Sequence, residues 1–461
     1  MNTVVIVSDT FRRDNLGCYS DRKVHTPHLD RFAEKCVIFN RAYSSAFPTM
    51  PMRADLMTGK YTFTYLVWGP LPEKEVIISQ TLADAGYTTM GIVDTPFFIK
   101  NRYGYDRGFH DFIENRGQGY YWWGGQDWRP REDRSDVTYE RRYEEDYCAP
   151  KTCLTAEHWL ERHYKEKFFL YVDTWDPHEP FDPPAYYVER YKPDWDGVYP
   201  IYHPAYKYLK GDSESGVAIK QNIDEKEINT QYACYCGEVT MVDRAVGRLI
   251  DRIESMGLMD NTVIIFTSDH GYYFGEHDIF GKMVVGLGEK EVAHTAPLYQ
   301  EVNNIPLLIY VPGVEPHRTD ALVSVPDFMP TILDLTEVKV PDMVQGSSFL
   351  PVIKGEKDTH QEFVVSTTPL QNPGAVTRVV DGKERELKHF FPATIVTDRW
   401  TLLYTWENAP IELYDIKSDP FQKKNVASDN NAVVKDLHKR YYEFLKKTGT
   451  EESLLKPRAS L

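Results

Sequence analysis

The sequence VIIFTSDHG, residues 263–271, combines a short apolar run with three residues that can carry chemistry. A run rich in β-branched side chains and bounded by polar residues is typical of a buried β-strand. The same pattern opens the chain, where V-V-I-V at residues 4–7 is followed by Ser8 and Asp9. Ligands of parallel sheets bind at the carboxyl ends of the strands. The residues after these two runs are therefore the first candidates for a functional site.

Further short apolar runs alternate along the chain with segments of helical periodicity. The other predicted strands are residues 89–93, 168–172 and 307–311. The predicted helices are residues 29–36, 154–165 and 228–256. Alternation of this kind predicts an α/β fold with a large, mostly parallel β-sheet sandwiched by helices.

The pattern changes after about Gly355. Polar strands are predicted at residues 362–366, 393–397 and 400–405, followed by a final helix at residues 431–447. This predicts a smaller C-terminal α+β subdomain. The expected division is a catalytic α/β domain at residues 1–355 and the α+β subdomain at residues 356–461.

Composition excludes several classes of protein. The chain has 461 residues, which is too long for a single small module. Of these residues 42% are hydrophobic, which is enough to form a large core. A formal net charge of −16 argues against nucleic-acid binding, because phosphate backbones favour a basic face. No apolar run reaches the roughly 18 residues of a membrane span. The first residues lack the features of a signal peptide, which predicts a cytoplasmic location.

Three of the polar residues after the strands form a candidate metal site. Asp9 follows the first predicted strand, and Asp269 and His270 follow the strand at residues 263–267. At strand carboxyl ends, two carboxylates and an imidazole can converge on one cation. Taken alone, an aspartate after a strand is more often a turn or helix cap.

A candidate nucleophile lies in the sequence T-M-P-M-R, residues 49–53. A hydroxyl followed two residues later by proline predicts the start of a helix whose free N–H groups can hold an oxyanion. Arg53, one turn after Thr49, could contact the same anion or stabilise an activated alkoxide. The alternative is an ordinary threonine cap.

These residues and their surroundings resemble the sulfatase branch of the alkaline phosphatase superfamily. Sulfatases carry a C/S-x-P-x-R motif on a helix that ends in T-G-R, and residues 49–60 match it except at the first and last positions. Similar text occurs at residues 9–19, 26–33, 105–109, 257–262, 275–277, 281–282 and 413–415. The resemblance spans nearly the whole chain and implies an alkaline-phosphatase-like fold.

The resemblance also implies roles for single residues. Asp9, Asp269 and His270 would bind the metal, with Thr49 bridging the metal and the substrate. Arg53 would support the nucleophile. Two further residues would act on the substrate: Lys282 would contact the transferred group, and His178, in D-P-H-E-P-F, would protect or protonate the leaving oxygen.

The sequence departs from the family pattern at several positions. Thr10 stands where many sulfatases have a second metal-binding aspartate, which is closer to the phosphonate monoester hydrolase subgroup. The G-K-W-H segment of the family is replaced by G-I-V-D-T, whose Thr95 is expected to line the substrate pocket. Residues 284–297 resemble an insertion, and they contain His294.

The departure at Thr49 has the largest consequence for mechanism. Sulfatases convert Cys or Ser to an aldehyde hydrate, and threonine offers no route to that group. A covalent intermediate on Thr49 must therefore be released by water, which phosphoryl groups tolerate well. The leading hypothesis is hydrolysis of a phosphodiester or phosphonate monoester. The alternatives are a sulfate esterase that uses unmodified Thr49, a phosphotransferase and a non-catalytic binding protein.

The expected cofactor is one divalent metal ion, and the expected partner is a small anionic ester. An oxygen-rich site with one imidazole suits Ca²⁺, Mn²⁺ or Mg²⁺, and zinc would fit better if His294 or His277 joined it. Aromatic side chains at Trp68, Trp122 and Trp123 could face a sugar or aryl group, or simply pack. The aromatic stretch at residues 117–147 is a candidate contact of a homo-oligomer.

Overall fold

The computed structural model describes residues 1–95, 97–99, 102–115, 141–199, 225–286, 292–295, 297–378, 384–387, 392–404 and 411–461. Its centre is an eight-stranded sheet in the order β14-β2-β13-β7-β1-β6-β4-β5. These strands are β1 (Asn2–Ser8), β2 (Val37–Phe39), β4 (Thr88–Val93), β5 (Asp111–Glu114), β6 (Phe168–Thr174), β7 (Thr262–Ser268), β13 (Leu307–Tyr310) and β14 (His317–Thr319). All five strands predicted for the main sheet belong to it.

The sheet is parallel except at one strand. β1 pairs in parallel with β6 and β7, and β4 pairs in parallel with β5 and β6. β13 is antiparallel to both of its neighbours, β7 and β2. The prediction of a mostly parallel sheet is confirmed, with one reversed strand that the apolar pattern alone did not reveal.

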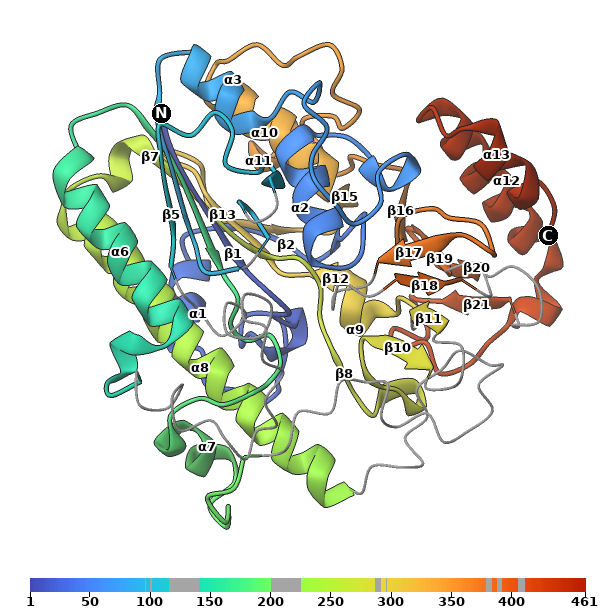
Figure 1. Cartoon of the computed structure of the whole chain (residues 1–461), viewed down its shortest axis with the longest axis horizontal. Coiled ribbons are helices and arrows are strands. Elements are labelled where there is room, and N and C mark those ends of the chain that lie inside the picture. The colour runs from blue at the N-terminus through green and yellow to red at the C-terminus, as the bar shows by residue number, and fades with distance from the viewer. Residues whose placement is uncertain are drawn as a thin grey trace.

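Helices cover both faces of the sheet (Figure 1). One face carries α1 (Pro27–Ala33), α6 (Cys148–His163), α7 (Ala185–Tyr191) and the long α8 (Glu225–Ser255). The other carries α2 (Thr49–Thr58), α3 (Ile78–Asp84), α10 (Phe328–Leu335) and α11 (Leu350–Ile353). Alternate residues of β1 serve the two faces: Val4 and Ile6 join one core, and Val5 and Val7 join the other. This explains why the strand is apolar throughout.

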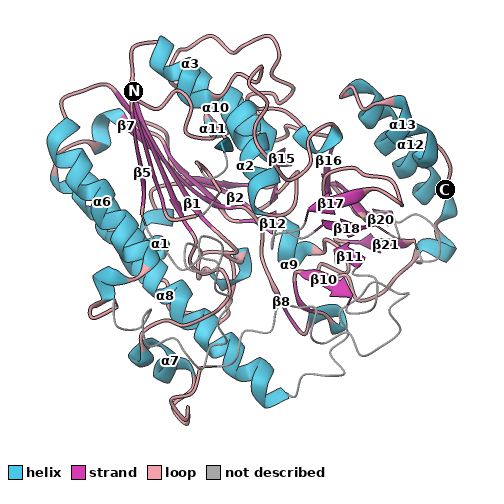
Figure 2. Ribbon diagram, in the orientation of Figure 1, coloured by secondary structure: helices cyan, strands magenta, loops and turns pink. Residues whose placement is uncertain are grey.

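The C-terminal part of the chain forms a second, smaller sheet (Figure 2). It has the order β16-β19-β20-β21, formed by β16 (Phe363–Thr367), β19 (Ala393–Thr397), β20 (Trp400–Tyr404) and β21 (Glu412–Asp415). The helix α12 (Asn431–Lys447) packs its apolar face against this sheet, and α13 (Glu452–Leu455) follows it. The predicted C-terminal α+β unit is therefore present.

Three minor sheets connect these parts. They are β12 (Asn304–Ile305) with β3 (Ala42–Tyr43) and β15 (Val323–Ser324); β8 (Tyr273–Phe274) with β9 (Phe280–Gly281); and β10 (Met283–Gly286) and β11 (Val292–Thr295) with β18 (Glu384–Glu386) and β17 (Val376–Arg378). The last of these sheets takes strands from both sides of residue 355, so the division at that residue stays a prediction. Among the described residues, no helix is both long and apolar enough to cross a membrane.

Candidate active site

The carboxyl ends of β1 and β7 bring two aspartates together. The two strands run in register, with Ser8 beside Ser268, so that Asp9 and Asp269 follow as neighbours. Both side chains are completely buried, as is His270. One ligand atom from each of the three residues lies within 4.8 Å of the others. The structure thus gathers the three predicted metal ligands at one point.

His270 has the tautomer that metal binding needs. Its Nδ1 lies 3.0 Å from the carbonyl oxygen of Gly271, which can only accept a hydrogen bond. Nδ1 therefore carries the proton, and Nε2 keeps its lone pair. Burial lowers the pKa of His270 to about 3, so the ring is neutral. Its Nε2 is buried without a hydrogen-bond partner.

The Oδ2 atom of Asp9 is also buried without a hydrogen bond, although Arg53 Nη1 lies 3.2 Å from it. Burial, followed by the charge of Asp269, raises the pKa of Asp9 well above its usual range. A divalent cation would partner this oxygen and relieve the repulsion between the two carboxylates. These residues therefore fit one divalent metal ion.

Arg53 fixes this cluster to helix α2. It is fully buried and forms a two-pronged ion pair with Asp173 at the end of β6, with N–O distances of 2.8 and 3.0 Å. Its Nη1 lies 2.5 Å from Asp269 and 3.2 Å from Asp9. One guanidinium thus joins the carboxyl ends of three neighbouring strands to the helix.

Thr49 is the first residue of α2 and is 2% exposed. Arg53 Nη1 donates to the Thr49 carbonyl oxygen over 3.1 Å, and the same nitrogen contacts Asp269. The start of the helix is thereby held beside the metal-ligand cluster. The N–H groups of a first helical turn lack partners inside the helix and favour a bound anion.

Lys282 also reaches the cluster and is 6% exposed. Its Nζ donates to the Thr10 hydroxyl over 3.0 Å and forms an ion pair of 3.1 Å with Glu179. Thr10 in turn donates through its hydroxyl to Asp9 over 2.7 Å and through its backbone N–H to Asp269 over 2.9 Å. Lys282 is thus connected to both aspartates through one residue.

His178 stacks on Trp175, with 3.8 Å between the ring centroids. Its Nδ1 donates to the Glu179 carbonyl oxygen over 2.5 Å, which leaves the lone pair on Nε2. Burial, and next the charge of Lys282, lower the pKa of His178 well below its usual value. The ring is neutral in the free site, and a bound anion would raise its pKa.

Comparison with known proteins identifies the family. The family model described as Sulfatase matches residues 1–338, and a second, described as N-sulphoglucosamine sulphohydrolase, C-terminal, matches residues 288–447. The first match covers well over half of the chain. The chain belongs to the sulfatase family. It is therefore an ester hydrolase with an alkaline-phosphatase-like fold.

Individual relatives of this sulfatase-family protein differ in what they act on. An ulvan-active sulfatase from Formosa agariphila is 27% identical and aligns over 92% of this chain and 76% of its own. The phosphonate monoester hydrolase of Silicibacter pomeroyi has a TM-score of 0.73 at 24% identity, covering 98% and 96% of the two chains. A structure bound to D-glucosamine-2-N,6-O-disulfate has a TM-score of 0.73 at 18% identity, covering 100% and 99%.

The structure adds three details to the predicted site. Thr95 donates its hydroxyl to Asp173, the aspartate that pairs with Arg53, and its place in the substrate pocket stays a prediction. His277 pairs with Glu301 over 3.2 Å, and the described residues place it outside the metal-ligand cluster. The side chain of His294 is outside the described part of the chain. Asp173 was not predicted, although it ends its strand as Asp9 and Asp269 follow theirs.

The aromatic predictions are tested only in part. Trp68 is described and packs edge-on against Phe97, with 5.5 Å between the ring centroids. Trp122 and Trp123 are outside the described residues. So is most of the stretch at residues 117–147 that was expected at an oligomer contact.

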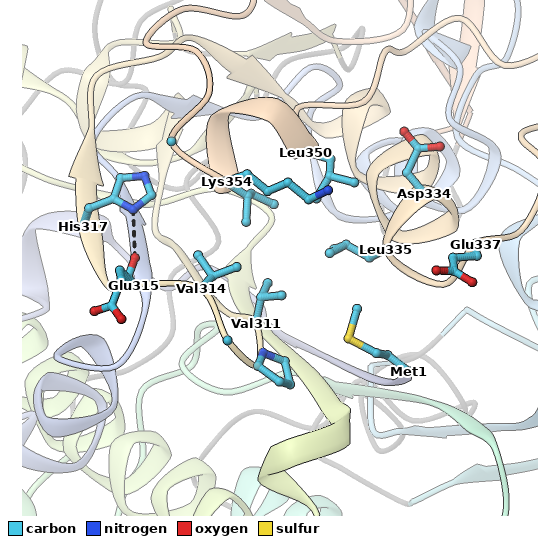
Figure 3. Close-up of a pocket in the computed structure, with 14 residues that line it drawn as sticks. Met1, Val311, Val314, Glu315, His317, Asp334, Leu335, Glu337, Leu350 and Lys354 are labelled. Carbon is cyan, nitrogen blue, oxygen red and sulfur yellow. Dashed lines mark hydrogen bonds between the residues drawn. The ribbon is translucent and has the colours of Figure 1, made fainter.

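A surface cavity of about 650 Å³ lies at the other end of the main sheet (Figure 3). Its wall contains Met1, which precedes β1, and Val311, which follows the antiparallel β13. Apolar Leu335 and charged Lys354 face the same space (Figure 3). None of the residues proposed for metal or substrate lines this cavity. The candidate active site is therefore the cluster around Asp9 and Asp269.

Proposed function

We propose that this sulfatase-family hydrolase cleaves a phosphodiester or a phosphonate monoester through a covalent intermediate on Thr49. The observation that carries the proposal is that Arg53 Nη1 contacts both the Thr49 carbonyl oxygen and Asp269, which holds this threonine, the first residue of α2, beside the Asp9–Asp269–His270 cluster. The aldehyde hydrate of sulfatases cannot form from threonine. Release by a second displacement at phosphorus needs no such group.

The proposed reaction consists of two successive displacements at phosphorus. In the first, Thr49 Oγ1 forms a bond to phosphorus, the bond to the alcohol oxygen breaks, and that oxygen takes a proton. In the second, water forms a bond to phosphorus and loses a proton, while Thr49 leaves and regains its hydroxyl hydrogen. A divalent ion held by Asp9, Asp269 and His270 would polarise the ester oxygens and favour the alkoxide form of Thr49.

Other side chains act on the charge that develops. Lys282 is placed to contact the non-bridging oxygens of the transferred group. His178, stacked on Trp175, would give a proton from Nε2 to the leaving alcohol after the bound anion has raised the pKa of the ring and Nε2 has been protonated. Arg53 holds Thr49 and Asp269 in one geometry through the contacts of its Nη1.

Sulfate ester hydrolysis is the second candidate. The matching family model is that of the sulfatases, and the Formosa agariphila relative is an ulvan-active sulfatase. Unmodified Thr49 would then form a sulfated intermediate that water must release at sulfur. The two candidates share the metal site and differ in the central atom.

The substrate assay compares p-nitrophenyl sulfate, a p-nitrophenyl phosphodiester and p-nitrophenyl phenylphosphonate with metal-loaded protein. We expect kcat for the phosphorus esters to exceed that for the sulfate by about tenfold or more, because kcat includes release of the intermediate and only phosphorus readily permits that second displacement. A preference for the sulfate ester would overturn the proposed function in favour of the second candidate.

His178→Gln is expected to slow the release of poor leaving groups. For an alkyl ester, kcat should fall by about 10²- to 10⁴-fold, the usual contribution of a positioned proton donor. For a p-nitrophenyl ester the loss should be much smaller, because that anion leaves without a proton. His163→Gln is the matched control, since His163 also stacks on a tryptophan, Trp159, outside the site. Equal losses with both leaving groups would contradict the assigned role.

A further inference from the structure

The charges around the cluster suggest which transferred group the site accepts. Arg53 contacts Asp9 and Asp269 directly, and Lys282 reaches both aspartates through Thr10. A phosphate monoester carries about two negative charges near neutral pH. A phosphodiester, a phosphonate monoester and a sulfate monoester each carry one. The carboxylates of Asp9 and Asp269 would balance the two charges of a divalent ion, so the positive charge that Arg53 and Lys282 leave for a ligand decides between the classes.

The positive charge of Arg53 is already balanced by carboxylates of the protein. Its two terminal nitrogens and Nε contact three carboxylates, those of Asp173, Asp269 and Asp9, at 2.5 to 3.2 Å. The side chain is completely buried. Its charge serves the protein's own aspartates.

Lys282 shares its charge with Glu179. The two side chains lie 3.1 Å apart, and both are nearly buried, with 6% and 9% of their side-chain surface exposed. Glu179 Oε2 is also 3.4 Å from His178 Nδ1. One carboxylate thus touches both residues that are placed to meet the substrate, one at the transferred group and one at the leaving oxygen.

We infer that Glu179 determines which substrates the site selects. By neutralising Lys282, it makes the site accept a singly charged transferred group and reject a doubly charged one. The inference rests on the proposed function and names the substrate class of the same site. A dianion would place its second charge beside Glu179 without a free cation to balance it. At the low effective dielectric of a buried site, one uncompensated charge at contact distance changes affinity by at least about tenfold.

Thr10 completes this arrangement. At the position where many sulfatases have a second metal-binding aspartate, its neutral hydroxyl accepts from Lys282 and donates to Asp9. An aspartate there would pair with Lys282 directly. In this chain the carboxylate that pairs with Lys282 comes from the loop of His178 instead.

The test measures binding, so that it does not depend on turnover. Metal-loaded Thr49→Ala protein is titrated by calorimetry with dimethyl phosphate, a monoanion, and with methyl phosphate, a dianion at pH 8. We expect the monoanion to bind at least about tenfold more tightly. Adding Glu179→Gln should reduce that ratio by about tenfold or reverse it, and adding Glu179→Asp should preserve it.

Glu75→Gln provides the matched control. Glu75 is 2% exposed and forms an ion pair of 2.9 Å with Lys60, which is 17% exposed; the loss of this carboxylate should leave the ratio unchanged. Tighter binding of methyl phosphate by the protein with Glu179 intact would overturn the inference, even if Glu179→Gln does not fold. An unchanged ratio in folded Glu179→Gln would also overturn it. Failure of the proposed function would appear separately, as absent phosphoester turnover with the charge preference retained.

Discussion

Thr49→Ala is expected to lower kcat/KM for the best phosphorus ester by about 10³-fold or more, the scale seen when a nucleophile is removed. The variant keeps the helix start and the contact from Arg53, because that contact is made to the Thr49 carbonyl oxygen. Substrate binding should therefore change little. Steady-state kinetics, with binding of a non-hydrolysed analogue measured separately, tests both parts of the expectation.

Two further variants make the Thr49 result specific. Thr49→Ser keeps a primary hydroxyl and should retain more activity than Thr49→Ala. Thr58→Ala removes a buried threonine hydroxyl from the other end of the same helix, where it bonds to the Ala54 carbonyl oxygen, and should leave kcat/KM near its original value. Thr49→Ala activity within about tenfold of the unaltered protein would rule out a nucleophilic role.

Asp269→Asn is expected to release the metal and to abolish turnover, with kcat falling by about 10³-fold or more. The substitution removes one of two carboxylates from a three-residue ligand set. It also weakens the ion pair that joins Asp269 to Arg53. The metal content per chain, measured by inductively coupled plasma mass spectrometry, should fall from one ion to far less than one.

Asp243→Asn is the control for loss of a buried carboxylate. Asp243 is 1% exposed and accepts hydrogen bonds from the backbone of His28 and Leu29, outside the cluster. This variant should keep one metal ion per chain even if it is less stable. If Asp269→Asn also kept one ion with unchanged affinity, the metal would have to bind elsewhere.

Much of the fold was predictable because strands that are buried on both faces consist of continuous apolar runs in the sequence. β1 and β7 are buried on both faces, so their apolar runs identify them without knowledge of their partners. β13 has the same apolar character but runs in the opposite direction, and strand direction leaves no mark on side-chain pattern. The short strands β2 and β14, of which β14 is the edge strand, were missed because three residues are too few to show a period.

The site was predictable where a residue's place in a strand or helix determines its role. Asp9, Asp269 and Arg53 follow from strand ends and from the helix start. Glu179 lies in the segment D-P-H-E-P-F, but the sequence predicts no role for it. Its partner Lys282 is about a hundred positions away in the chain. Only the folded structure brings these two together.

Peptide mapping of the enzyme quenched in acid during turnover of p-nitrophenyl phenylphosphonate tests the covalent mechanism most directly. The account predicts a phenylphosphonate adduct on the peptide that contains Thr49, formed as p-nitrophenol is released in the first turnover. An adduct on another residue, or an unmodified Thr49 throughout a single turnover that yields product, would contradict it.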